Sequence, residues 1–179
     1  FNLPFDISRI ALQAPQGRLS YREGFSMQIS ENQYYPRLIV NKQTNTMSFI
    51  NWAKPLNKEQ KRFRGHFLDL RMTCHALTDR KYSLSSACEA FNTEYKKQKV
   101  KEHGKIYGPE YIAYCIADVK ATYSLYQETK KEFDTYKLDI PITKAYTPAS
   151  IGKEILKKIK VKSFGEKNAD FPPEITGHI

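Results

Sequence analysis

The chain has 179 residues, enough for one domain with a buried core. Its hydrophobic share of 40% and charged share of 27% are typical of an ordinary globular protein. No apolar run reaches the roughly 18 residues that a membrane span requires, which argues against a membrane protein. We therefore expect a soluble, cytoplasmic protein.

The charge balance and the aromatic content point toward a polyanionic partner. Lys and Arg number 29 against 19 Asp and Glu, so the formal net charge is +10. A basic surface attracts nucleic acid, and an aromatic share of 13% offers rings on which bases can stack. A basic protein with an ordinary aromatic core would show the same numbers. Composition alone therefore does not distinguish it from a nucleic-acid-binding protein, and sequence motifs are needed.

The ends and the cysteines add two expectations. The chain opens at Phe1 without an initiator Met, which predicts a piece of a longer protein. Cys74, Cys88 and Cys115 form no close pair, which favours reduced thiols over a disulfide framework or a zinc site.

The first half of the chain predicts strands with one short helix. A helix is expected over 6–12 with Asp6 near its start, a strand over 25–29, and a hairpin over 36–52 with its turn at 41–45. A basic stretch, 58–64, leads into an apolar segment, 67–77. Because helices follow these strands, the sequence predicts a mixed α/β domain.

The second half predicts helices. Ser83 caps a helix reaching Phe91, and Gly108-Pro109 opens a long helix that ends near Tyr136. A basic linker, 96–105, separates them, a further helix covers 150–159, and a connector follows from 163. We expect two parts, a domain over 1–140 and a helical connector over 141–179. The apolar stripe of the long helix is predicted to comprise Ile112, Cys115, Ile116, Val119, Tyr123 and Tyr126.

Two short motifs carry candidate chemistry. Asn2, Phe5 and Asp6 form an N-x-x-F-D pattern at a helix start, and Tyr114 and Asp118 form a Y-x-x-x-D pattern within the long helix. The four-residue spacing places the phenol and the carboxylate on one helix face. There a carboxylate can hold a hard divalent cation while a hydroxyl orients water, as two-metal phosphodiester hydrolysis requires.

In their order and flanks these motifs resemble the second and third exonuclease motifs of DEDD-type proofreading exonucleases, tyrosine subclass, in family B DNA polymerases. The protein-primed and organellar or plasmid-type members are the most similar. Between them, Ser83-Leu84 resembles the family's Ser-Leu element, and 97–100 fits its Lys-x-x-hydrophobic element. Segments 146–153 and 171–177 resemble the passage toward a polymerase module.

The resemblance implies an RNase H-like mixed α/β fold with an inserted β-hairpin, whose N-terminal strands lie outside this chain. It implies a Mg²⁺ or Mn²⁺ site with ligands Asp6 and Asp118, and a water positioned by Tyr114. The substrate would be the 3′ end of single-stranded DNA, cut to nucleoside monophosphates, with the rest of the polymerase chain as partner. Its contacts would be Asn2, Phe5, Ser83 and Leu84, with Lys97 at the scissile phosphate.

The family's first motif, Asp-x-Glu, should precede Asn2, and no such triplet occurs in the sequence. We therefore expect the isolated chain to be inactive or nearly so. A non-catalytic DNA-binding or scaffold domain with an exonuclease-like fold is the alternative, and a general basic single-strand binder is a third possibility.

Simpler interpretations of single residues stay open. Asp6 could be a helix N-cap, Asp118 a surface residue or the partner of a lysine, and Tyr114 a core residue. Asp69 could be a further metal ligand, but a structural role is favoured for it. Three tyrosines could lie in the core or form a surface on which bases stack, and the core is favoured. They are Tyr111, Tyr123 and Tyr126.

Overall fold

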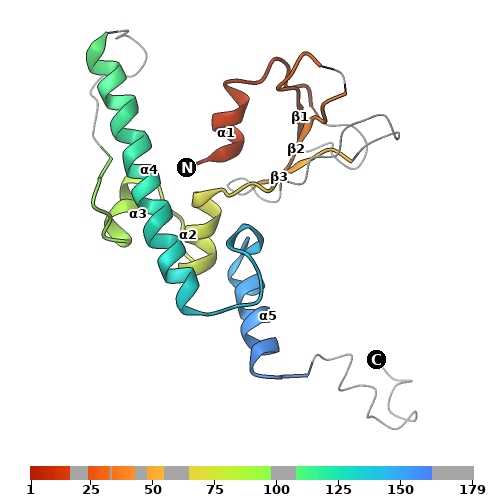
Figure 1. Ribbon diagram of the computed structural model, residues 1–179, viewed down its shortest axis with the longest axis vertical. Coiled ribbons are helices and arrows are strands. Elements are labelled where there is room, and N and C mark those ends of the chain that lie inside the picture. Colours follow the sequence, from red (N-terminus) through yellow and green to blue (C-terminus); the bar gives the residue numbers. More distant parts are fainter. Residues whose placement is uncertain (17–23, 33, 43–47, 55–64, 98–107, 163–179) are drawn as a thin grey trace.

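The computed structural model describes residues 1–16, 24–32, 34–42, 48–54, 65–97 and 108–162. Within them, one three-stranded antiparallel sheet and five α-helices give a mixed α/β architecture, as the sequence predicts. The sheet and α1 lie at one end, the long helix α4 stands beside α2 and α3, and α5 lies beyond α2 (Figure 1). No helix in the described part of the chain is long and apolar enough to cross a membrane.

The sheet contains the predicted hairpin. Its strands are β1 (Phe25–Met27), β2 (Leu38–Lys42) and β3 (Ser48–Trp52), in the order β1-β2-β3. Leu38 and Val40 alternate with less buried neighbours, so one face of β2 packs inward. The predicted turn at 41–45 is wrong at its start, because Asn41 and Lys42 belong to β2 and pair with Phe49 and Ser48 of β3. Positions 43–45 and the basic stretch over 58–64 lie outside the described residues.

Helix α1 (Leu3–Ser8) covers the sheet, and it begins earlier than predicted. The expected helix over 6–12 is wrong because Pro4 lies in the first turn, where its fixed φ favours a helix start. The chain then leaves the helix, and Leu12 N–H donates to the Gln28 carbonyl at 2.7 Å beside β1. The alternative N-cap role of Asp6 is also wrong, since Asn2 holds that position without a side-chain cap bond.

Apolar residues of α1 and of the segment after it join the core of the sheet. Leu3, Ile7 and Ala11 pack against a buried cluster whose members are Met27, Leu38, Val40 and Ile50. Together they fix α1 against the face of the sheet.

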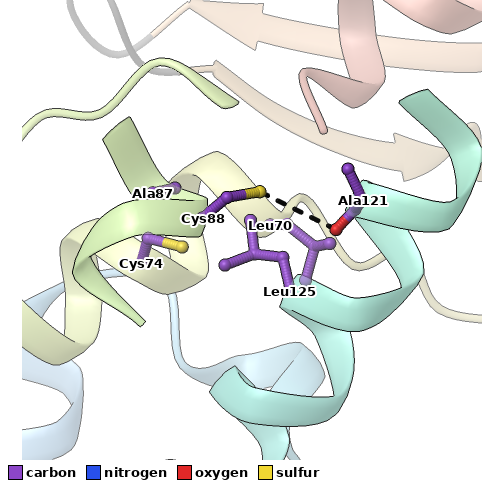
Figure 2. Close-up of a cluster of buried hydrophobic side chains, with 6 residues drawn as sticks. All are labelled: Leu70, Cys74, Ala87, Cys88, Ala121 and Leu125. Atoms are coloured by element: carbon purple, nitrogen blue, oxygen red, sulfur yellow. Dashed lines mark hydrogen bonds between the residues drawn. The ribbon is translucent and has the colours of Figure 1, made fainter. Parts of the chain in front are cut away.

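Helices α2 (Leu70–Thr78), α3 (Leu84–Ala90) and α4 (Pro109–Thr135) form the second layer. Ser83 caps α3 through a capping box with Ser86, and Gly108-Pro109 opens α4, both as predicted. Figure 2 shows the buried cluster between the three helices, which consists of Leu70, Cys74, Ala87, Cys88, Ala121 and Leu125. Burial raises the pKa of the Cys74 thiol to about 12, so this cysteine stays neutral in the core.

Tyr126 packs against the core, but the other residues of the predicted apolar stripe of α4 are exposed. Ile112, Ile116, Val119 and Tyr123 are 51–68% exposed, and Cys115 is also exposed. The inward face of α4 combines the larger Leu125 and Phe133 with small or hydroxyl-bearing residues, which let α2 and α3 approach the backbone of α4 closely. The buried residues of α4 are Ala121, Ser124, Leu125, Thr129 and Phe133.

The C-terminal described segment packs on α2 and α4. A short 3-10 helix, η2 (Ile142–Lys144), leads into α5 (Pro148–Lys158), which Thr147 caps through a capping box with Ser150. The helix therefore begins two residues before the predicted start. A third buried cluster joins α5 to the earlier helices through Ala76, Phe133, Ala145 and Ile151. The connector from 163 lies outside the described residues, and the boundary at 140/141 stays a prediction.

Candidate functional site

A cleft of about 1090 Å³ opens between α1, the start of α3 and the middle of α4. Phe1 lines it, and the N-terminus lies between α1 and α4 in Figure 1. Seven of the eight predicted site residues line this cleft, all except Tyr114, and they come from separate parts of the chain. These are Asn2, Phe5, Asp6, Ser83, Leu84, Lys97 and Asp118.

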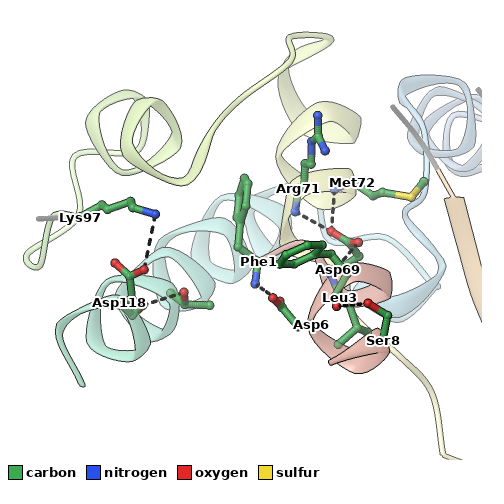
Figure 3. Close-up of polar contacts among 11 residues, drawn as sticks. Phe1, Leu3, Asp6, Ser8, Asp69, Arg71, Met72, Lys97 and Asp118 are labelled. Atoms are coloured by element: carbon green, nitrogen blue, oxygen red, sulfur yellow. Dashed lines mark hydrogen bonds and ion pairs between the residues drawn. The ribbon is translucent and has the colours of Figure 1, made fainter. Parts of the chain in front are cut away.

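Asp69 holds α1 at the edge of the cleft. Its Oδ1 accepts hydrogen bonds from the backbone N–H groups of Arg71 (2.9 Å) and Met72 (3.3 Å), which caps α2. Its Oδ2 accepts from the N–H of Leu3 at 3.1 Å, and Arg71 N–H also donates to the Phe1 carbonyl at 3.2 Å (Figure 3). Asp69 thus has a structural role, since both oxygens face backbone donors.

The carboxylate of Asp69 is held in a buried place. Desolvation raises the pKa of this carboxyl above its ordinary value near 3.8, although its three backbone hydrogen bonds work against that rise. Burial therefore favours the neutral form of this carboxyl, and the backbone hydrogen bonds favour its ionised form.

Asp6 and Phe5 project from α1 toward solvent. The Asp6 side chain is 52% exposed, and its Oδ2 lies 3.2 Å from the Phe1 ammonium. Phe5 is 51% exposed, with the Arg9 guanidinium 4.5 Å from its ring centroid. Asp6 is thus accessible to a ligand in the cleft, and one face of the Phe5 ring carries a cation.

Across the cleft, Asp118 on α4 is paired with Lys97. The Lys97 Nζ lies 3.4 Å from Asp118 Oδ2 and 6.0 Å from the centroid of the Tyr114 ring (Figure 3). Asp118 Oδ1 is buried and has no hydrogen-bond partner among the described residues. The pairing of Asp118 with a lysine is therefore present, and it occurs at the cleft wall.

The electrostatics of these three groups are coupled. Burial raises the pKa of Tyr114, and hydrogen bonding to Asp118 adds to that rise while hydrogen bonding to Lys97 opposes it. Burial lowers the pKa of Lys97, but hydrogen bonding to Tyr114 and the charge of Asp118 outweigh it and raise the pKa overall. The structure therefore brings Tyr114, Asp118 and Lys97 together, although Tyr114 itself does not line the cleft.

The cleft also contains residues that sequence reasoning missed. Arg71 and Lys81 add positive charge, and Tyr123 and Tyr126 add aromatic surface. Nothing in the local pattern around Arg71 or Lys81 marks them. For Tyr123 and Tyr126 the sequence favours the core and leaves a stacking surface as the alternative; Tyr126 packs against the core, whereas Tyr123 is exposed.

The donor chemistry fits a hard divalent cation, although the donor number is small. Asp6 and Asp118 offer carboxylate oxygens to the same cleft, and oxygen is the donor that Mg²⁺ and Mn²⁺ prefer. Among the described residues, no group of three or more His, Cys, Asp or Glu is placed to hold a metal. A complete two-metal site would need further ligands.

Comparison with models of protein families, with curated protein sequences and with solved structures gave no match. The function is therefore argued from the cleft and its residues.

Proposed function

We propose that this chain is part of an RNase H-like 3′–5′ proofreading exonuclease module of a family B-like DNA polymerase. Its substrate is the 3′ end of single-stranded DNA, from which nucleoside monophosphates are released. The observation that carries the proposal is the convergence of both motifs and the Ser-Leu element on one cleft. Residues chosen from the sequence for this chemistry share a cavity although α1 and α4 are far apart in sequence.

Each side chain has a role in this proposal. Asp6 and Asp118 hold a divalent cation, which supplies Lewis-acid activation and charge stabilisation when bound. Tyr114 orients the attacking water through its hydroxyl, and Lys97 places positive charge beside the scissile phosphate. Asn2, Phe5, Ser83 and Leu84 hold the frayed strand end along the cleft.

Asp6 and Asp118 make half of the carboxylate set that the resemblance implies. We propose that an Asp-x-Glu segment of a longer protein supplies the other half, together with the remaining strands of the sheet. The isolated chain is then silent as an enzyme while retaining part of its DNA-binding surface.

Degradation of a 3′-labelled single-stranded DNA in Mg²⁺ or Mn²⁺ tests this function. The assay compares the present chain, a version extended upstream through an Asp-x-Glu strand, and that version with Asp118→Asn. Asp134→Asn is the matched control, because Asp134 also pairs with a lysine on α4, Lys130, but lies outside the cleft. Cleavage only by the extended protein and its Asp134→Asn form is the expected result.

A non-catalytic DNA-binding domain is the second candidate. It is favoured by the ion pair of Asp118 with Lys97, in which an ammonium group already neutralises this carboxylate. An extended protein that binds DNA but never cuts it, in either metal, would replace the exonuclease by this candidate.

A further inference from the structure

The wall of the cleft formed by α4 carries an exposed aromatic surface. Tyr123 is 60% exposed, and its ring centroid lies 6.2 Å from that of Tyr126 at an interplanar angle of 39°. Tyr126 is partly buried and packs against the cluster of α2, α3 and α4. A fixed ring therefore lies beside an exposed one, and both line the cleft.

Cations surround this surface. Arg71, Lys81 and Lys97 line the same cleft. The side chains of Arg71 and Lys81 make no ion pair or hydrogen bond with other described residues, and Figure 3 shows the Arg71 guanidinium directed away from the Asp69 carboxylate. Cations without an ion pair among the described residues, in one cleft with an exposed tyrosine ring, match a phosphate backbone that carries unstacked bases.

We propose that Tyr123, held in place by Tyr126, is a stacking platform for a base of single-stranded nucleic acid, and that Arg71 and Lys81 contact its phosphates. This inference rests on the proposed function and deepens it, because it names how the strand upstream of the reacting end is held. Stacking on a tyrosine accepts every base, since each base presents a π-face. Binding at this subsite is therefore tolerant of sequence.

The test is fluorescence anisotropy of a labelled oligothymidylate with the 179-residue chain in EDTA, so that no metal chemistry contributes. Tyr123→Ala weakens binding roughly 5- to 150-fold, the range expected for the loss of one base–aromatic stack. Tyr123→Phe keeps the ring and binds like the unmodified chain. Tyr34→Ala is the matched control, because Tyr34 is 46% exposed and lies outside the cleft.

Two further measurements separate bases from phosphates. An abasic oligonucleotide of equal length removes the stacking partner, so the unmodified chain and Tyr123→Ala bind it equally. Arg71→Gln and Lys81→Gln each reduce the slope of log affinity against log salt by about 1 without changing base preference.

Normal binding of oligothymidylate by Tyr123→Ala overturns the stacking platform. Absence of any binding in EDTA overturns it as well. Both results leave metal-dependent cleavage by the extended protein to be decided separately, so failure of the subsite is distinguishable from failure of the exonuclease.

Discussion

Replacing Asp69 separates two functions of one carboxylate. Its Oδ1 caps α2, and its Oδ2 connects α2 to α1 through Leu3 N–H. Asn caps helices about as well as Asp, so Asp69→Asn retains an oxygen for Arg71 and Met72. The NH₂ group of the substituted Asn side chain then faces the N–H of Leu3. Because both groups are donors, the hydrogen bond that connects α1 to α2 is lost. Asp69→Ala removes both functions.

The expected losses of stability follow from the hydrogen bonds. In Asp69→Ala, Arg71 N–H still has the Phe1 carbonyl as acceptor, so the N–H groups of Met72 and Leu3 lose their partner. At about 1–3 kcal/mol for each unsatisfied group, and near the low end for partly buried ones, the loss is about 2–4 kcal/mol. Asp69→Asn leaves one group unsatisfied and costs about 1–2 kcal/mol.

The difference in free energy of unfolding between the unmodified chain and Asp69→Asn depends on pH. The folded-state pKa of Asp69 is raised, so the folded chain binds more protons than the unfolded chain just above the ordinary value near 3.8. The stability from Asp69 is therefore greatest below that value and falls as pH rises through the raised pKa. The Asn side chain does not titrate. The loss in free energy of unfolding caused by Asp69→Asn is therefore smaller at neutral than at acidic pH.

Urea unfolding measures these free energies, and amide hydrogen exchange reports α1 directly. Exchange should accelerate at Asp6 N–H, which bonds to the Asn2 carbonyl, more than in α3. Asp79→Asn is the control, since Asp79 ends the same helix at φ 57°, a conformation that Asn tolerates, and its side chain is 80% exposed. Unchanged protection of α1 in Asp69→Asn would show that its connection to Leu3 does not position α1.

Two further pairs of substitutions test packing by thermal or urea unfolding. Gly24→Ala should destabilise by at least about 1–3 kcal/mol, because its Cβ would lie 1.8 Å from the Val40 carbonyl oxygen, whereas Gly152→Ala in α5 meets nothing within 4 Å and should stabilise by about 0.4–1 kcal/mol. Equal effects at both glycines would contradict the close approach at β2. Leu125→Ala should cost about 2–5 kcal/mol because Leu125 is fully buried, and Leu156→Ala, at a 49% exposed position, should stay within about 0.5 kcal/mol. A small loss at Leu125 would mean that the cluster between α2, α3 and α4 is not a packed core.

Local signals predicted the elements that depend on neighbouring residues. Ser83 with Ser86 three positions later specifies the start of α3, and Gly108-Pro109 specifies the start of α4. The capping groups and their partners lie within one turn. Such starts can therefore be recognised without knowing what the helix packs against.

The inward face of α4 was not predicted because burial depends on the neighbouring helices. Large apolar residues from Ile112 to Tyr123 suggested one face, whereas Ala121, Leu125 and Thr129 form a second stripe at spacings of 4 that is fully buried. A small residue such as Ala121 contributes little to a hydrophobic pattern, yet it permits close helix packing. The partnership of Asp69 with Leu3 spans 66 positions, and no local pattern encodes it.

The buried stripe of α4 explains why the site lies where it does. Tyr114 and Asp118 precede Ala121 and Leu125 at spacings of 4, 3 and 4, so all four residues share one side of the helix. Toward the C-terminus this side is covered by α2 and α3, and Ala121 and Leu125 are fully buried. Toward the N-terminus the same side reaches the cleft, where polar groups replace apolar ones and Asp118 meets Lys97. Because core and site share one rigid helix side, the packing of Ala121 and Leu125 fixes the position of the Asp118 carboxylate.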